Sequence, residues 1–263
     1  MEFKNKIFCE DCRITMENMI CEDFKVDLIL TSPPYNTSKY GNLSNKQKDN
    51  RNRRYDVFIE DKSDDSYINW TIAIFDYFDK ILSENGVVLY NLGYGNEKNE
   101  LMWNCVYYLI KYSNFTIVDD IIWKKKNAVP NVSSPNKLTR ICEHIFVFCR
   151  KSEYMSFKTN KRVINVSKVG QKFYNNFSNF IEASNNDEPC ELNKATFSSD
   201  LVEQLLSMYV PKSKEVVVYD AFMGTGTTAK GCEMYGVNWV GSEISEAQVE
   251  YARNRLKSVQ LTL

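Results

Sequence analysis

The chain has 263 residues, of which 43% are hydrophobic, and this is enough to bury one sizeable core, so we expect a single domain over residues 1–263. Its 33 basic and 34 acidic side chains give a net charge of −1, which excludes the strongly basic composition typical of modules that bind nucleic acid by charge alone. No signal-peptide pattern or apolar run of membrane-spanning length is present, so a soluble, cytoplasmic protein without membrane contact is expected.

Apolar runs that suit strands alternate with helical patterns along the chain. The strand candidates lie at residues 7–8, 26–30, 87–90, 116–123, 144–148, 215–219 and 238–241. The helical patterns lie near residues 67–82, 100–112, 201–208 and 245–256. This alternation predicts an α/β fold with one mostly parallel sheet of about seven strands, covered by helices on both faces. Sheets of this kind bind ligands beyond the carboxyl ends of their strands.

A turn with distinctive chemistry follows the second apolar run, where residues 31–36 have the sequence Thr-Ser-Pro-Pro-Tyr-Asn. Pro33 and Pro34 fix the backbone and donate no N–H bond, so carbonyl oxygens such as that of Pro33 stay free to accept bonds from an NH₂ group. Tyr35 suits stacking on a flat ring that carries such an amine. The motif alone fits an ordinary turn with an aromatic plug equally well.

The polar stretch 37–66, directly after this turn, is basic in its central part. Between residues 39 and 54 only Asp49 is acidic, against the basic residues Lys39, Lys46, Lys48, Arg51, Arg53 and Arg54. We expect a loop beside the turn that contacts the phosphates of a nucleic acid. A solvated surface loop is the alternative interpretation.

A second motif follows the apolar run 215–219, where residues 220–229 have the sequence Asp-Ala-Phe-Met-Gly-Thr-Gly-Thr-Thr-Ala. Gly224 and Gly226 let the backbone turn closely around a ligand. Glu243 stands 19 residues after Gly224, where nucleotide-binding α/β units keep a carboxylate for ribose hydroxyls. This order of strand, glycine turn, helix, strand and acid favours nucleotide binding over a purely structural turn. No Gly-Lys-Ser/Thr follows, which excludes a Walker loop.

The glycine motif stands near the end of the chain, with only 20 residues beyond Glu243, and the Ser-Pro-Pro-Tyr motif stands near the start. With this order the chain resembles, over nearly its whole length, the DNA amino-methyltransferases of the β group. The resemblance implies a circularly permuted Rossmann-like methyltransferase fold, S-adenosylmethionine as cofactor, and DNA as partner, methylated on adenine-N6 or cytosine-N4. It also admits a cognate restriction endonuclease as a partner, and either a monomer or a homodimer.

Position by position, the resemblance implies roles for individual residues. Asp11 corresponds to an acid near the cofactor adenine, and Glu243 to the ribose ligand. The chain departs from the family where Asn193-Lys194 replace the usual His-Pro before the cofactor segment. The implied sets are cofactor binding by Asp11, Thr196, Phe197, Asp220, Phe222, Gly224, Gly226, Thr227 and Glu243, catalysis by Ser32, Pro33, Pro34 and Tyr35, and DNA contact by Asn36, Lys39, Arg51, Arg53, Arg54 and Lys124.

The helix and strand rhythm weakens between residues 151 and 192, where the family carries target recognition. Its basic side chains suit phosphates or base edges, and a surface excursion that closes the sheet is the alternative. They are Lys158, Lys161, Arg162, Lys168 and Lys172.

The implied mechanism starts from an exocyclic amine, which is a poor nucleophile because its lone pair is delocalised into the ring. Acceptance of its two N–H groups by Ser32 and the Pro33 carbonyl favours a pyramidal nitrogen that attacks the sulfonium methyl group. The base must be flipped out of the duplex to be reached, with Tyr35 stacking on it. Adenine and cytosine both stay open as targets. The alternatives are a methyltransferase that acts on RNA or on a protein amide, and a non-catalytic DNA-binding relative.

Eight cysteines and one histidine, His144, offer little metal chemistry. Cys9 and Cys12 form a single Cys-x-x-Cys, and the sequence has no second such pair to complete four ligands, so we expect no zinc site. Four further cysteines stand in apolar runs and are expected to be buried thiols, as in a reducing compartment. They are Cys105, Cys142, Cys149 and Cys232.

Overall fold

The structure, a computed structural model, describes residues 2–36, 62–93, 98–128, 130, 132, 135–136, 138–188, 190–193 and 196–260. Ten strands are found in these residues: β1 (Lys6–Cys9), β2 (Val26–Thr31), β3 (Leu82–Leu92), β4 (Phe115–Lys125), β5 (Cys142–Arg150), β6 (Val163–Val166), β7 (Lys172–Tyr174), β8 (Phe180–Ala183), β9 (Val217–Asp220) and β10 (Asn238–Glu243). The α-helices are α1 (Cys12–Cys21), α2 (Asp64–Ile81), α3 (Leu101–Tyr112), α4 (Ser199–Tyr209), α5 (Thr227–Tyr235) and α6 (Glu246–Gln260), and one 3₁₀ turn, η2, covers Lys151–Glu153.

Eight of these strands form one sheet in the order β1-β10-β9-β2-β3-β5-β4-β8. All neighbouring pairs are parallel except the two that involve β5, which is antiparallel to both β3 and β4. The predicted mostly parallel α/β sheet is therefore confirmed, and each of the seven predicted strands forms. The sequence prediction missed α1, the edge strand β8 and the separate hairpin of β6 and β7.

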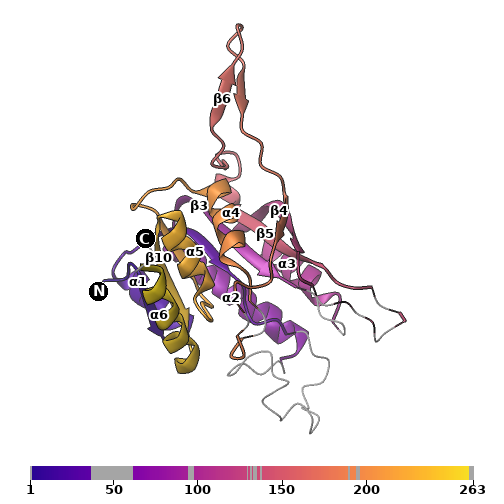
Figure 1. Ribbon diagram of the computed structural model, residues 1–263, viewed down its shortest axis with the longest axis vertical. Coiled ribbons are helices and arrows are strands. Elements are labelled where there is room, and N and C mark those ends of the chain that lie inside the picture. The colour runs from indigo at the N-terminus through magenta and orange to yellow at the C-terminus, as the bar shows by residue number, and fades with distance from the viewer. Residues whose placement is uncertain are drawn as a thin grey trace.

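Helices cover both faces of the sheet, and the strands supply side chains to each face in turn (Figure 1). Along β2, Leu28 and Leu30 pack into a core with α4, α5 and α6, whereas Ile29 between them packs into a second core with α1, α2 and α3. This alternation follows from the two-residue period of a strand. Burial on both faces explains why the sequence shows continuous apolar runs for these strands rather than an alternating pattern.

The edge of the sheet formed by the carboxyl ends of the parallel strands differs from the opposite edge, formed by their amino ends. The turns that follow β1, β2, β9 and β10 all lie at the edge where the parallel strands end. Because β5 runs the opposite way, its last residue, Arg150, pairs with Phe115 at the start of β4, on the other edge. The chain then passes the end of α4, where the backbone N–H of Asn160 donates to the carbonyl of Met208, before it forms the β6–β7 hairpin. Figure 1 shows this hairpin projecting away from the rest of the fold.

The described helices include none that is long and apolar enough to cross a membrane. Within the same residues, no group of three or more histidine, cysteine, aspartate or glutamate side chains is arranged to hold a metal ion. All eight cysteines are free thiols. Cys105, Cys149 and Cys232 are buried as predicted, but Cys142 is only partly buried because it stands at the first position of β5.

Arg150 joins three elements at the edge opposite the parallel strand ends, and this generates a stability prediction. Its guanidinium donates to the Asp79 carboxylate at 2.6 Å and to the carbonyls of Asp79, Leu82 and Ser83 at 2.7, 2.6 and 2.9 Å. Arg150→Leu removes the guanidinium donors from these acceptors and leaves the Asp79 carboxylate with the bond from Asn114, so we expect the free energy of unfolding to fall by about 2–4 kcal/mol in urea denaturation. Lys6→Ala, at an exposed ion pair, serves as control. An unchanged midpoint for Arg150→Leu would contradict this account.

Candidate active site

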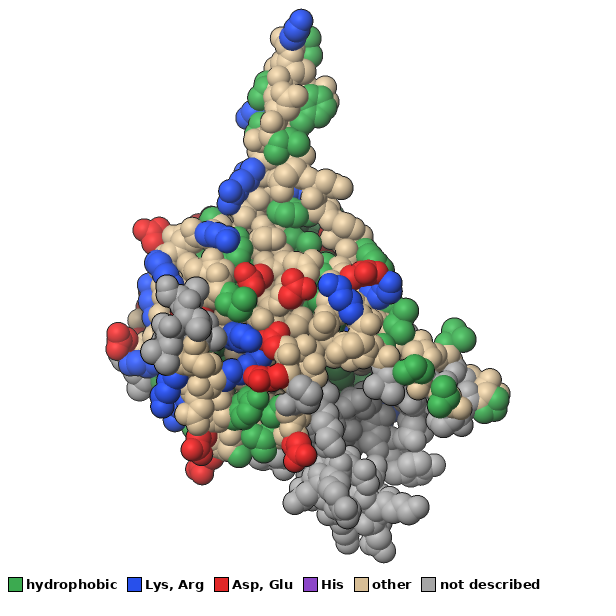
Figure 2. Space-filling model, viewed as in Figure 1, with side chains coloured by type: hydrophobic (Ala, Val, Ile, Leu, Met, Phe, Trp, Pro, Cys, Tyr) green, Lys and Arg blue, Asp and Glu red, His purple; other side chains and the backbone are tan. Residues whose placement is uncertain are grey.

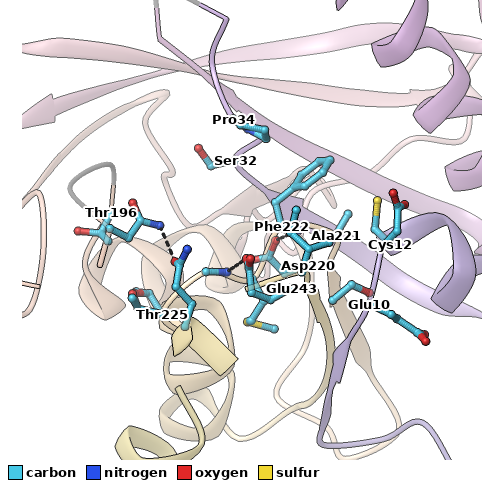
Figure 3. A pocket seen from close by; sticks show the side chains of 18 of the residues that line it. Glu10, Cys12, Ser32, Pro34, Thr196, Asp220, Ala221, Phe222, Thr225 and Glu243 are labelled. Atoms are coloured by element: carbon cyan, nitrogen blue, oxygen red, sulfur yellow. Dashed lines mark hydrogen bonds between the residues drawn. The ribbon is translucent and has the colours of Figure 1, made fainter. Parts of the chain in front are cut away.

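A cavity of about 340 Å³ opens at the edge where the parallel strands end (Figure 3). Its volume falls in the range of roughly 300–1,000 Å³ that small-molecule sites occupy. Side chains from the turns after β1, β2, β9 and β10 converge on it, together with the segment before α4. Of the predicted site residues, it is lined by Asp11, Ser32, Pro34, Thr196, Phe197, Asp220, Phe222, Gly224, Thr227 and Glu243.

Glu243, the predicted ribose ligand, is held at the end of β10 by two backbone N–H groups. Its Oε2 accepts from Gly224 at 2.8 Å, and its Oε1 accepts from Ser245 at 2.9 Å. Gly224 has φ +54°, a left-handed conformation that a residue with a side chain rarely adopts, and this turn brings its N–H to the carboxylate. Each carboxylate oxygen has a further lone pair, so Glu243 is fixed in place and can still accept from a ligand hydroxyl.

Asp220 ends β9 at the floor of the cavity and is only 2% exposed. Its carboxylate accepts from Thr31 Oγ1 at 2.6 Å, from the backbone N–H of Phe222 at 3.0 Å and from Thr228 Oγ1 at 2.5 Å. Burial raises the pKa of this carboxyl group, although the three donors oppose the shift. Thr31 is the residue directly before Ser32, so Asp220 ties the end of β2 to the glycine turn.

Asp11 lines the cavity where β1 passes into α1, and it is also the N-cap of that helix. Its carboxylate accepts from the backbone N–H of Arg13 at 2.9 Å and from the guanidinium of Arg13 at 2.9 and 2.7 Å. The hydrogen bond from the Arg13 side chain is the main reason that the pKa of Asp11 is lowered. The carboxylate is therefore ionised at neutral pH and orders the helix start as well as the cavity wall.

The catalytic turn divides its side chains between the cavity and the interior. Ser32 and Pro34 face the cavity, whereas Tyr35 is only 6% exposed and packs in the core beside α2. The structure therefore does not present the Tyr35 ring for stacking on a base. Asn36, predicted to contact DNA, is 1% exposed, and its amide donates to the carbonyl of Lys62 at 2.6 Å. Neither Pro33 nor Tyr35 is among the residues that line the cavity.

The other predicted DNA-binding residues are not gathered at the cavity. Lys124 lies on β4, pairs with Glu182 of the edge strand β8 and does not line the cavity. Most of the predicted loop, residues 37–61, lies outside the described residues, and this includes Lys39, Arg51, Arg53 and Arg54.

Sequence reasoning missed several residues that line the cavity. Trp70 of α2 packs on Phe222, with ring centroids 5.5 Å apart. Asn193, which stands where the family usually has His-Pro, donates to Gln248 of α6 at 3.2 Å inside the cavity wall. The helical pattern predicted α2, but it could not show that Trp70 faces the end of β9.

Comparison with known proteins decides the family. The sequence matches the family model of N6 and N4 methyltransferases, described as DNA methylase, over residues 26–254. The chain belongs to this family. This confirms the predicted class of enzyme, a DNA methyltransferase acting on adenine-N6 or cytosine-N4, and S-adenosylmethionine is the cofactor that this membership implies.

Two curated relatives span most of the chain. Identity is 25% with the type II methyltransferase M.HinfI of Haemophilus influenzae, over 98% of this chain and 70% of the relative. It is 24% with the orphan methyltransferase M.BamHII of Bacillus amyloliquefaciens, over 90% of each chain.

Solved structures share the fold. The cytosine-N4-specific PvuII DNA methyltransferase has a TM-score of 0.67 at 17% identity, covering 97% of this chain and 89% of its own. The complex of M1.HpyAVI with S-adenosylmethionine has a TM-score of 0.63 at 19% identity, covering 95% and 98%. The predicted Rossmann-like methyltransferase fold is thus confirmed, and its circular permutation stays a prediction.

The two glycines of the cofactor turn have different surroundings, which can be tested. Gly226, predicted to bind cofactor, has φ +82° but does not line the cavity, and a Cβ atom there would lie 2.8 Å from the Cβ of Ala252 in α6. Gly226→Ala should therefore lower the free energy of unfolding by about 1–2 kcal/mol and leave the affinity for S-adenosylmethionine unchanged.

Gly224→Ala is the matched comparison, because Gly224 also has a positive φ of +54° but lines the cavity, where its Cβ would lie 2.9 Å from Nδ2 of Asn193. We expect a similar loss of stability together with a loss of cofactor affinity. Urea denaturation and calorimetric titration measure the two effects. Equal losses of affinity in the two variants, measured on folded protein, would refute this distinction.

Burial of Asp220 generates a pH prediction. A folded pKa above the ordinary value of 3.8 stabilises the fold below that value, and this contribution is lost as pH rises through the folded pKa. Relative to Asp220→Asn, whose amide cannot ionise, the wild type should become less stable as pH increases from below 3.8 towards neutrality. Urea denaturation of both proteins over this range measures the difference, and a difference of the opposite sign would contradict the assignment.

Proposed function

We propose that this chain transfers a methyl group from S-adenosylmethionine to the exocyclic amine of an adenine or cytosine that is flipped out of DNA. The observation that carries this proposal is that Ser32 and Pro34 of the catalytic turn line the same cavity as Phe222 and Glu243 of the cofactor half (Figure 3). The two motifs are nearly 190 residues apart in the chain, yet the parallel sheet brings their strand ends to one edge.

The residues of the cavity fit the cofactor that the family implies. Glu243 is placed to accept from ribose hydroxyls, and Asp11 gives a second ionised carboxylate beyond the end of β1, where we place the adenine. Phe222 and Trp70, whose rings pack on each other, offer aromatic surface in the cavity wall. When bound, S-adenosylmethionine supplies an electrophilic methyl group on a positively charged sulfur.

The catalytic turn would activate the amine. Ser32 Oγ accepts one N–H group at the cavity wall, and the carbonyl oxygen of Pro33, which does not line the cavity in this structure, accepts the other once DNA binding brings the base against the turn. Both bonds favour a pyramidal nitrogen whose lone pair is free to attack. The rigid Pro33-Pro34 backbone holds these acceptors, and Tyr67 Oη donates to the carbonyl of Pro34 at 3.0 Å, which fixes the turn from behind. Stacking of the flipped base on Tyr35 stays a separate prediction, alternative to a buried role of this residue, because it requires the buried ring to become exposed when DNA binds.

DNA contact is proposed for two parts of the chain, the residues around the catalytic turn and the predicted recognition segment 151–192. In the first part, the predicted contacts are Asn36, Lys39, Arg51, Arg53, Arg54 and Lys124. Residues 154–181 carry five cations and no acidic residue, and Figure 2 shows basic and hydrophobic side chains along the hairpin. Because the hairpin leaves the opposite edge of the sheet, we propose that it contacts phosphates distant from the target base rather than the flipped nucleotide.

The identity of the methylated base and the presence of a partner endonuclease stay predictions. Relatives with known specificity include a cytosine-N4 enzyme, but at 17% identity this does not choose between adenine and cytosine here. The names of the curated relatives include both a type II and an orphan methyltransferase, so a cognate restriction endonuclease is a prediction that the relatives leave open.

Transfer of tritiated methyl groups tests the proposal. Purified protein should label DNA in preference to RNA or protein, and mass spectrometry of the digested nucleosides should find N6-methyladenine or N4-methylcytosine. Ser32→Ala should lower the single-turnover rate by about 10²-fold with the affinities for DNA and cofactor unchanged, because its acceptor is needed as the amine pyramidalises. A product methylated at carbon 5 of cytosine would refute the mechanism, since the turn contains no cysteine nucleophile.

A further inference from the structure

A row of polar side chains crosses three neighbouring strands behind the catalytic turn. It consists of Asn91 on β3, Glu143 on β5 and Lys125 on β4. In the strand register Trp123 lies opposite Glu143 and Asn91 lies opposite Ile145, so the three polar residues occupy diagonal positions on one face of the sheet. The row is largely shielded from solvent, with side chains 17% exposed at Glu143 and 20% at Lys125, and Asn91 3% exposed.

The row connects directly to the two side chains of the catalytic turn. Asn91 Nδ2 donates to Tyr35 Oη at 2.6 Å and to Glu143 Oε2 at 3.1 Å. Tyr35 Oη donates to Glu143 Oε2 at 3.3 Å and lies 3.0 Å from Ser32 Oγ. Lys125 Nζ donates to the other oxygen of Glu143 and balances its charge. An unbroken chain of hydrogen bonds therefore runs from the cavity wall at Ser32 to a partly buried ion pair.

The Glu143 carboxylate fixes the direction of donation along this series of hydrogen bonds. An ionised carboxylate only accepts hydrogen bonds, so the Tyr35 hydroxyl directs its proton to Glu143. The oxygen of Tyr35 is then an acceptor for the Ser32 hydroxyl, which directs its proton away from the cavity. Asn91 Nδ2 also donates to Ser32 Oγ at 3.3 Å, so one lone pair of Ser32 Oγ is left for a donor in the cavity, and successive bonds in such a chain strengthen one another. Asn91 keeps this order, because the reverse orientation of its amide would set an oxygen against the carboxylate.

We propose that Glu143 is a positioning residue for methyl transfer, which acts through Tyr35 Oη to make Ser32 an acceptor for the substrate amine. The proposal rests on the proposed function and adds to it a residue on β5 that lies outside both sequence motifs. It gives the buried hydroxyl of Tyr35 a task that needs no contact with the base. Lys125 holds the charge in place, and its Nζ lies 5.1 Å from the centroid of the Trp123 ring.

Glu143→Gln and Tyr35→Phe, alone and combined, test the proposal in single-turnover methylation of DNA by the full chain. Glutamine keeps the size of the side chain, but its amide can donate to Tyr35 and reverse the chain of bonds. Each single variant should lower the rate constant about tenfold with the affinities for S-adenosylmethionine and DNA unchanged. The double variant should be no slower than the slower single variant, because both changes break the same chain.

Glu17→Gln is the matched control. Glu17 on α1 accepts from Tyr77 Oη of α2 at 2.7 Å, so the same chemical change is made at a carboxylate and tyrosine pair that lies outside the cavity. Its methylation rate should equal that of the wild type. If Glu143→Gln retains the wild-type rate, or if the two losses multiply in the double variant, Glu143 does not act through Tyr35 and the proposal is overturned.

Two further outcomes separate the causes of failure. A wild-type protein that methylates no DNA amine refutes the proposed function itself, whereas a methylating wild type with an equally fast Glu143→Gln variant refutes only the role of Glu143. Should Glu143→Gln fail to fold, Tyr35→Phe decides alone, since it removes one oxygen atom and keeps the ring in its core. A wild-type rate for Tyr35→Phe would then overturn the proposal.

Discussion

The buried carboxylate of Asp220 is the contact on which the arrangement of the site depends. It accepts from Thr31, the last residue of the strand that leads into the catalytic turn, and from Phe222 and Thr228 on either side of the glycine turn. Burying a carboxylate is costly unless several donors satisfy it, so each donor is held in a defined place relative to the other two. The distance between the two motifs is thereby set by one side chain, which explains why both can serve one cavity.

Residues at the ends of parallel strands were predictable from the sequence, because a continuous apolar run followed by a polar turn marks the edge where ligands bind. The stretches 31–36, 220–226 and Glu243 all have this form, and the structure brings Ser32, Pro34, residues 220–225 and Glu243 to one cavity. Elements without such a signal were missed. The edge strand β8 has only four residues, and α1 begins at Asp11, for which the sequence predicted only a role in cofactor binding and not a helix cap.

Sequence could not show in which direction the side chains of the catalytic turn point. Ser32 and Tyr35 are three residues apart in one motif, yet Ser32 lines the cavity and Tyr35 is buried against Asn91 and Glu143. That difference depends on strands β3 and β5, whose pairing is antiparallel and joins residues 52 to 60 positions apart in the chain. The segment 151–192 shows the same limit, because only the reversed direction of β5 places its hairpin at the edge opposite the cleft.

The net charge of the chain is near zero, but acidic and basic side chains are separated in a way that suits both S-adenosylmethionine and DNA. Among the described residues that line the cavity, the carboxyl groups of Glu10, Asp11, Asp220 and Glu243 outnumber the cationic side chains of Arg13 and Lys62. A negative cavity favours a cofactor with a positively charged sulfur and would repel DNA phosphates. Cations without acidic neighbours stand instead in segments away from the cavity floor, as at residues 158–172. In the proposed reaction the flipped base is the part of DNA that enters, since it carries no charge, and the phosphates stay outside.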